Sequence, residues 1–195
     1  IRTYGTANFG LFSMLSLDYS FANEWSSTLP VGNRGFFYQA AGLSFVASEL
    51  FNAPNKWVNY VKLRANIGTQ GNGAPRYALN SVYVASPDLT PTGSFPIQFP
   101  FGGVPGFTTG NTIGNPALTP EQSLTIEGGV DLGFFQDRLT VEYTYYKIQN
   151  KSLIVNVSLP SSSGFTRTIL NIGQMSNKGH ELLVRATPLR DVKGI

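Results

Sequence analysis

The alternation of apolar and polar residues between Leu124 and Tyr145 limits the possible folds of this chain more than any other feature. The first half of this stretch predicts a strand whose apolar face consists of Leu124, Ile126, Gly128, Val130, Leu132 and Phe134. After a turn at residues 135–137, the second half predicts another strand, with Leu139, Val141, Tyr143 and Tyr145 on one face. Strand-length segments with one apolar and one charged face, joined by a tight turn, are typical of a transmembrane β-barrel.

Composition is compatible with a barrel. Charged residues make up 13% of the 195 residues, whereas soluble domains contain about 25%. A hydrophobic content of 42% and a mean hydropathy of −0.04 would also suit a soluble protein, because only every second residue of a barrel strand is apolar. No run of about 18 apolar residues occurs, so no transmembrane helix is expected. The N-terminal residues lack the pattern of a signal peptide, and any export signal is expected outside this chain.

The residue types present argue against several classes of function. The formal charge of +3 is spread along the chain instead of forming a basic run, so we expect no nucleic-acid binding. The absence of cysteine excludes disulfides, thiolate metal sites and cysteine nucleophiles. The single histidine, His180, has no ligand partners in a recognisable spacing, and Ser161–Ser163 lie outside any Gly-x-Ser-x-Gly motif. We therefore expect no enzyme, no metal and no cofactor.

The number of expected strands is too small for a complete barrel. Five or six strands are expected, at about residues 11–21, 37–47, 57–68, 124–134, 139–149 and 178–187. Residues 22–35 are expected to be turn-rich and residues 52–55 to form a short connection. Because the smallest single-chain barrels have about eight strands, the chain is expected to be part of a larger polypeptide or assembly.

Two stretches are expected to be long loops, namely residues 70–121 and 150–176. Bacterial barrels place long loops outside the cell and short turns in the periplasm, so these two are expected to be extracellular. Long loops are often functional. Aromatic residues of the first loop are candidate ligand contacts, although they could equally pack the loop against itself or a partner. These candidates are Tyr83, Phe95, Phe99, Phe101 and Phe107.

Charged and polar residues on the strands are expected to line a watery lumen. The candidates are Lys62, Arg64, Asn66, Glu127, Asp131, Arg138, Glu142, Glu181 and Arg185. A pair of carboxylates among them could instead act as the acid and base of a glycosidase, but the lumen role is favoured. A different alternative for the whole chain is a soluble, extracellular, carbohydrate-binding β-sandwich, which would bury the apolar faces in a core between two sheets.

Several motifs together resemble the C-terminal half of a SusC/RagA-type transporter, one of the TonB-dependent receptors of Bacteroidetes. They are GNPALTPE, the strand ending GVDLGFF, the turn residues QDRL, VEYTYYK, SSSGF and LNIGQMSNKGHELLVRATP, with KLRANIGTQGNG and FFYQAAGLSFVASELF before them. The resemblance implies an all-β fold: residues 1–195 would belong to a single transmembrane antiparallel barrel domain of about 22 strands that holds a plug. The plug and the terminal strand are expected to be absent from this chain.

The resemblance also implies location, activity and partners. It implies an integral protein of the bacterial outer membrane, in contact with its lipid, that imports an oligosaccharide or peptide. The implied partners are a SusD-like surface lipoprotein over the loops and the TonB-ExbB-ExbD system, which would act through an N-terminal part that is absent here. A third alternative is a barrel of this family that serves as a subunit of a larger envelope complex.

The motifs carry mainly structural expectations, and one departure from the family pattern stands out. Asn115 and Pro116, with Pro120 and Glu121, predict a bend that returns a loop to the barrel wall. Residues 171–173 predict a strand entry or a bulge. Between Tyr19 and Gly35, about one strand of the family pattern is missing. Either this protein has lost a strand, or the given sequence joins two segments across a gap near residues 25–26, and we expect the gap.

Overall fold

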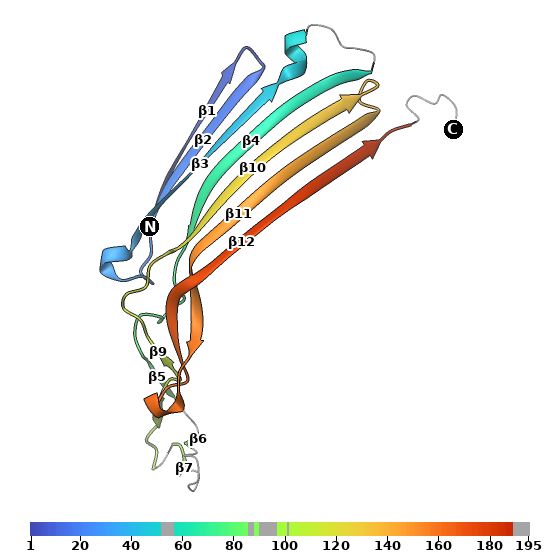
Figure 1. Cartoon of the computed structure of the whole chain (residues 1–195). Coiled ribbons are helices and arrows are strands. Elements are labelled where there is room, and N and C mark those ends of the chain that lie inside the picture. The colour runs from blue at the N-terminus through green and yellow to red at the C-terminus, as the bar shows by residue number, and fades with distance from the viewer. Residues whose placement is uncertain (52–56, 86–87, 90–96, 101, 189–195) are drawn as a thin grey trace.

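A single curved antiparallel sheet dominates the structure, a computed structural model that describes residues 1–51, 57–85, 88–89, 97–100 and 102–188 (Figure 1). Its long strands are β1 (Arg2–Leu11), β2 (Leu15–Trp25), β3 (Gly35–Val46), β4 (Val58–Asn72), β10 (Glu121–Phe134), β11 (Leu139–Ser158) and β12 (Arg167–Ala186). Each pairs with the next in this order, and the short β9 (Thr112–Ile113) adds a parallel bridge to β12. The sheet is open, as expected for part of a barrel.

The connections differ in length at the two ends of the sheet. The 3-10 helices η1 (Val31–Asn33) and η3 (Ser161–Ser163) lie at one end, together with the long segment between β4 and β10. That segment contains two small sheets, formed by β5 (Tyr83–Ala85) with β8 (Phe107–Thr109) and by β6 (Asp88–Leu89) with β7 (Ile97–Gln98). We call this the long-loop end. The opposite, short-turn end has η2 (Ala47–Phe51) and two tight turns.

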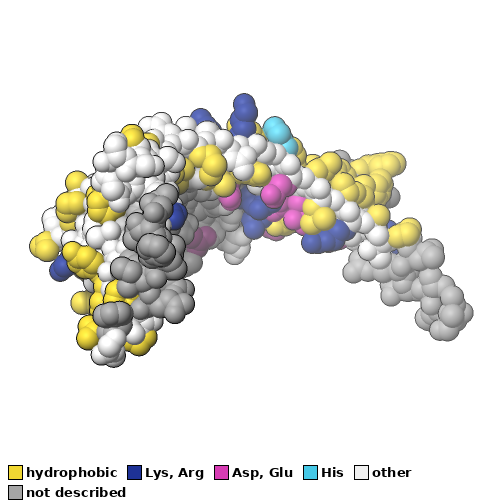
Figure 2. All heavy atoms as spheres, turned by 90° about the horizontal axis from the view of Figure 1, so that it is seen from below, with side chains coloured by type: hydrophobic (Ala, Val, Ile, Leu, Met, Phe, Trp, Pro, Cys, Tyr) yellow, Lys and Arg dark blue, Asp and Glu magenta, His cyan; other side chains and the backbone are white. Residues whose placement is uncertain are grey.

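The two faces of the sheet have opposite character, as the alternation predicts. The apolar face is convex and the charged face is concave (Figure 2). On the convex face, Leu17, Leu63 and Leu182 are 42%, 48% and 67% exposed. In the described residues no second sheet covers this face, so the β-sandwich alternative is wrong. No helix in the described part of the chain is long and apolar enough to cross a membrane.

The few fully buried side chains gather at the long-loop end. Leu29, Ala74, Ala78 and Leu118 form a small core, against which Phe36, Leu79, Ile154 and Ile169 pack. Leu29 precedes η1, whereas Leu118 belongs to the segment that enters β10. This core therefore fixes the base of the long segment 73–120 to the end of the sheet.

The tight turn between β10 and β11 was predicted correctly. Phe135, Gln136 and Asp137 all have positive φ angles, which a two-strand reversal of this kind requires. Asn59 Nδ2 donates a 2.6 Å hydrogen bond to Asp137 Oδ1, and the rings of Trp57 and Phe135 meet edge-on at 5.5 Å. Side chains from the start of β4 thus brace a backbone shape that residues other than glycine adopt at a cost.

The first hairpin was predicted wrongly. The expected strand at residues 11–21 contains a turn, because Phe12 and Ser13 have positive φ and Met14 N donates to Leu11 O (3.1 Å). β1 precedes this turn and was missed, so the described residues contain seven long strands, more than the expected five or six. Small residues on the convex side of β1, such as Gly5, weaken its apolar alternation. The ring of Phe21 covers the space where a Gly5 side chain would lie.

In the structure β2 and β3 form a direct hairpin, with β2 paired to β3 up to Trp25 opposite Gly35. Ser26 N donates to Arg34 O (3.0 Å), which closes a compact connection. The expected gap near residues 25–26 stays a prediction.

The second expected loop, residues 150–176, consists mostly of strand. β11 continues to Ser158 and β12 begins at Arg167, so only residues 159–166 connect them. The register shifts between Asn150 and Ile154, where Ser152 has a positive φ. A bulge of this kind moves later side chains to the opposite faces, which hides the alternation in the sequence. The expected loop at 70–121 corresponds to the segment between Asn72 and Glu121. The expected connection at 52–55 lies outside the described residues.

Candidate functional site

Arg64 holds three strands of the concave face together. Its Nε donates to Asp131 Oδ1 (3.0 Å) on β10, and its Nη2 donates to Thr144 Oγ1 (2.9 Å) on β11. The side chain crosses directly above Gly129, its register partner, where a Cβ would lie 3.0 Å from Arg64 Nε. Glycine at position 129 therefore leaves room for the guanidinium to reach both Asp131 and Thr144.

A second ion pair lies nearer the short-turn end. Arg185 Nη1 approaches Glu142 Oε1 at 3.2 Å, with the two side chains 67% and 35% exposed. Exposed pairs of this kind contribute at most about 1 kcal/mol. Lys62 is opposite Asp131, which is opposite Glu142, so charges of both signs line neighbouring positions of three strands.

The other lumen candidates fall into three positions. Asn66 and Glu127 are register partners on the concave face and line a hollow of about 480 Å³ with Asp18 and other residues of β1 to β3. Glu181 is opposite Thr144 on the same face. Arg138 lies in the turn before β11 and outside the strands. The structure thus brings eight of the nine candidates onto one face and leaves Arg138 at its end.

A hollow at the long-loop end of the concave face was not predicted from the sequence. Its volume is about 520 Å³, and its lining includes Arg2, Tyr4, Glu24, Phe36 and Tyr38. The Tyr38 hydroxyl donates to Glu24 Oε2 (2.6 Å), and the Arg2 guanidinium carbon lies 5.7 Å from the centre of the Tyr38 ring. We call this group the aromatic cradle.

The aromatic cradle combines flat rings with a charged pair. The ring centres of Phe36 and Tyr38 lie 5.8 Å apart, and both residues point to the concave side of β3. Rings of this kind stack on sugar faces or on apolar side chains, while the carboxylate and the guanidinium bind hydroxyls, amides or charges. The cradle was missed because β1 was not expected and residues 22–35 were expected to be turn-rich. The alternation of Arg2 and Tyr4 with small residues was the available signal.

Three of the five loop aromatics can be placed. Tyr83 and Phe107 are 75% and 60% exposed and share one side of the β5–β8 sheet, where Tyr83 pairs with Thr109 and Ala85 with Phe107. Phe99 packs against Gly106, so it supports its own loop. Phe95 and Phe101 lie outside the described residues.

The segment NPALTPE forms a hydrogen-bonded clasp, as its predicted scaffold role requires. Asn115 Nδ2 donates to Ile169 O (2.9 Å). Asn171 accepts from Thr119 N (2.9 Å) and donates to Thr119 O (2.9 Å) and to Ser152 O (2.8 Å) at the bulge. Glu121 accepts from Ile154 N (2.8 Å). These bonds fix the start of β10 and the long segment before it to β11 and β12.

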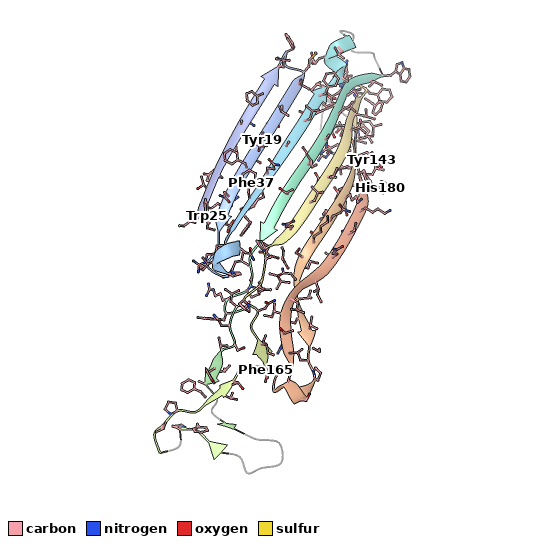
Figure 3. The ribbon with its side chains drawn as sticks, turned by 60° about the vertical axis from the view of Figure 1, so that its left-hand side comes forward. Tyr19, Trp25, Phe37, Tyr143, Phe165 and His180 are labelled. Carbon is pink, nitrogen blue, oxygen red and sulfur yellow. The ribbon has the colours of Figure 1, made fainter. Side chains whose placement is uncertain are left out.

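The histidine belongs to the convex face. His180 Nδ1 lies 2.7 Å from the Tyr143 hydroxyl, and its ring centre lies 5.1 Å from that of Tyr145. Figure 3 shows Tyr143 and His180 close together on β11 and β12. In the described part of the chain no three His, Cys, Asp or Glu residues are close enough to hold a metal ion. His180 thus extends an aromatic cluster on the apolar face.

Sequence comparison connects this arrangement to known proteins. A family profile described as "TonB dependent receptor-like, beta-barrel" matches residues 2–191. TonB-dependent receptor P3 of Formosa agariphila is 26% identical over 192 residues, which cover 95% of this chain and 18% of that protein. TonB-dependent receptor SusC of Bacteroides thetaiotaomicron is 25% identical over 193 residues, which cover 97% of this chain and 18% of SusC. The chain therefore spans less than a fifth of the length of these relatives.

Structure comparison gives the same fold. The RagAB peptide importer in its closed-closed state has a chain that matches with a TM-score of 0.82 at 23% identity, covering 98% of this chain and 20% of its own. The siderophore receptor PirA of Pseudomonas aeruginosa matches with a TM-score of 0.59 at 18% identity, covering 93% of this chain and 30% of its own. The resemblance to SusC and RagA predicted from the motifs is confirmed.

Proposed function

Because the chain belongs to the TonB-dependent receptor-like β-barrel family, we propose that it forms part of the wall of a SusC/RagA-type transporter in a bacterial outer membrane. Support comes from the curved open sheet, whose apolar convex face suits lipid and whose charged concave face suits water. The long strands have 10 to 20 residues, which equals or exceeds the roughly 9 to 11 that span a bilayer. The whole protein would close the sheet with further strands around a plug.

The orientation follows from the two ends of the sheet. The long-loop end lies outside the cell and the short-turn end lies in the periplasm. The concave face then lines the lumen, where Lys62, Arg64, Asp131 and the other lumen candidates meet water and the plug. Tyr83 and Phe107 extend outside the cell, where they contact substrate or a partner.

The activity is active import of a nutrient without covalent change to it. A SusD-like lipoprotein closes over the long-loop end, and the TonB-ExbB-ExbD system displaces the plug. The cargo is an oligosaccharide or a peptide. RagAB is a peptide importer and supports the second class. No catalytic step is assigned, because the named relatives are receptors and importers.

The aromatic cradle is the observation that carries the proposal of substrate binding. It lies on the concave face at the long-loop end, where a substrate released by an outer lid first meets the wall. Its paired Tyr38 and Glu24 offer both a ring face and hydrogen-bonding groups. A sugar or a short peptide needs both for recognition, because its polar groups would otherwise lose water without compensation.

The proposal is tested by uptake in cells that carry the full-length protein. Cells producing Tyr38→Ala should take up the cargo about two- to tenfold more slowly at low concentration, with a raised KM, because a stacked ring contributes about 0.5–1.5 kcal/mol. Growth on oligosaccharides and on peptides as sole carbon source identifies the cargo class. The matched control is Tyr19→Ala on the convex face, where the hydroxyl donates to Gln39 Oε1 (2.8 Å).

Membrane fractionation comes first. A full-length protein that is absent from the outer-membrane fraction and shows no heat-modifiable band on gels would refute the barrel. Equal uptake by the Tyr38 and Tyr19 variants would remove the cradle from the substrate path. Wild-type cells that import nothing, while the protein copurifies with a different large envelope assembly, would favour the subunit role instead.

A further inference from the structure

We propose that the convex face, on the long-loop side of Tyr145 and His180, binds the phosphate-bearing headgroup of a glycolipid in the outer leaflet of the membrane. The residues that carry the proposal are Lys147, Lys151 and Lys178, which we call the lysine patch. This inference rests on the proposed membrane orientation, although it concerns the lipid face and not the transport path.

The lysine patch is unbalanced in charge. Lys147 and Lys178 are directly opposite each other on β11 and β12, and Lys151 follows on β11 opposite Gln122. All carboxylates of β10, β11 and β12 alternate onto the concave face; they are Glu121, Glu127, Asp131, Glu142 and Glu181. No lysine of the patch forms an ion pair within the described residues. Like charges opposite each other destabilise a sheet unless an anion lies between them.

The position of the patch matches a membrane boundary. On the same face, the next pair toward the short-turn end is Tyr145 with His180. The pair after that is Tyr143 with Leu182, which belongs to the apolar band. Dark-blue side chains project from the convex surface beside the single histidine (Figure 2). Lysine stems can lie on apolar surface while the ammonium reaches the headgroups. The patch therefore stands at phosphate depth in the leaflet on the long-loop side.

A hollow beside the patch provides room for the rest of a headgroup. Its volume is about 420 Å³, and its lining comes from both faces of the sheet. Phe37, Leu124, Gln122, Gln149 and Lys151 line it on the convex face, and Phe36, Tyr38 and Glu121 line it from the concave face. It arises where the β3–β4 ladder stops at Ala40 opposite Gly68. Beyond this point the Thr69 hydroxyl replaces the backbone partner of Gln39: it accepts from Gln39 N (3.0 Å) and donates to Gln39 O (3.2 Å).

The lining fits an amphipathic glycolipid better than a free ion. Phe37 and Leu124 suit the start of an acyl chain, and the amides of Gln122 and Gln149 suit sugar hydroxyls. Lys151 at the edge, with the Lys147–Lys178 pair below it, supplies point charges for phosphates. About 13 Å separates Lys147 from Lys151 along the strand, a span suited to a headgroup with more than one anionic group.

The test measures lipid retained by the purified full-length protein. Protein extracted from outer membranes is placed in phosphatidylcholine nanodiscs with purified lipopolysaccharide, and bound lipid is counted by native mass spectrometry. Lys178→Gln should retain about fivefold less, and the triple variant K147Q/K151Q/K178Q about a hundredfold less, since each surface lysine contributes about a factor of five. The matched control, Lys62→Gln on the concave face, should retain the wild-type amount.

Two further arms identify the ligand. Dephosphorylated lipopolysaccharide should not be retained by any variant. Inorganic phosphate at about 50 mM, enough to compete for a site that binds free phosphate, should not displace the intact lipid. Equal retention by wild type and triple variant, retention of the dephosphorylated lipid, or displacement by phosphate alone would each overturn the proposal. A heat-modifiable band confirms that each variant is folded. If the protein is not in the outer membrane, the proposed function fails first, and fractionation reports that separately.

Discussion

Arg64 reaches two neighbouring strands because residue 129 has no side chain. Its register partner Gly129 leaves room for the guanidinium to cross β10, and Asp131 and Thr144 accept its hydrogen bonds. The next glycine, Gly128, points to the convex face, where nothing lies within 4 Å of a Cβ. Two adjacent glycines thus have different roles, and only the one beneath Arg64 is required for packing.

Replacing Gly129 should destabilise the protein, whereas replacing Gly128 should not. Gly129→Ala should lower the stability of the full-length protein by about 1–2 kcal/mol, because it displaces Arg64 from partly exposed charged hydrogen bonds. Gly128→Ala should be neutral or slightly stabilising. Urea unfolding followed by tryptophan fluorescence in detergent measures both. Equal destabilisation by the two substitutions would contradict the role given to Gly129.

At the level of elements, the clasp joins a long connection to strands that are far away in sequence. The Asn171 side chain accepts a hydrogen bond from Thr119 N and donates one to Thr119 O. It also donates to Ser152 O at the bulge of β11. The bulge and the clasp therefore depend on each other. A loop fixed at its base in this way can keep its outer part in one place relative to the lumen.

Asn171→Ala should loosen the long segment without unfolding the barrel. Loss of three hydrogen bonds from a partly buried amide costs about 1–3 kcal/mol, which is enough to populate an open segment. Limited proteolysis of intact cells should cleave residues 73–120 about tenfold faster. Asn177→Ala, on the same strand and exposed, serves as the control. If both variants are cleaved at the wild-type rate, the clasp does not hold this segment.

For the whole molecule, the prediction concerns orientation. The chain contains no cysteine, so an introduced thiol is the only one in this part of the protein. Val31→Cys in the β2–β3 connection, where Val31 is 79% exposed, should react with a membrane-impermeant maleimide on intact cells. Phe12→Cys in the β1–β2 turn, where Phe12 is 81% exposed, should react only after the outer membrane is permeabilised. The reverse pattern would invert the proposed topology.

The sequence predicts the wall better than the site. β4 and β10 alternate strongly because each separates bulky apolar residues from charged ones, and their faces were assigned correctly. β1 alternates weakly, since Gly5 relies on Phe21 of the next strand to cover it. The far halves of β11 and β12 were missed because irregularities between Asn150 and Leu153 on β11 and between Asn171 and Gly173 on β12 break the two-residue period. The aromatic cradle includes Arg2 and Tyr4 of β1, so it was missed together with that strand.

The directions of the two outer strands limit how the sheet can be closed. β1 and β12 both run from the long-loop end to the short-turn end (Figure 1). They therefore cannot pair with each other in an antiparallel barrel, and an odd number of strands must stand between them. Two copies of this sheet cannot close a barrel with both copies the same way up, because joining β1 to β1 would turn one copy upside down in the membrane. Homodimerisation is thus no route to a working pore, and closure depends on strands of other sequence.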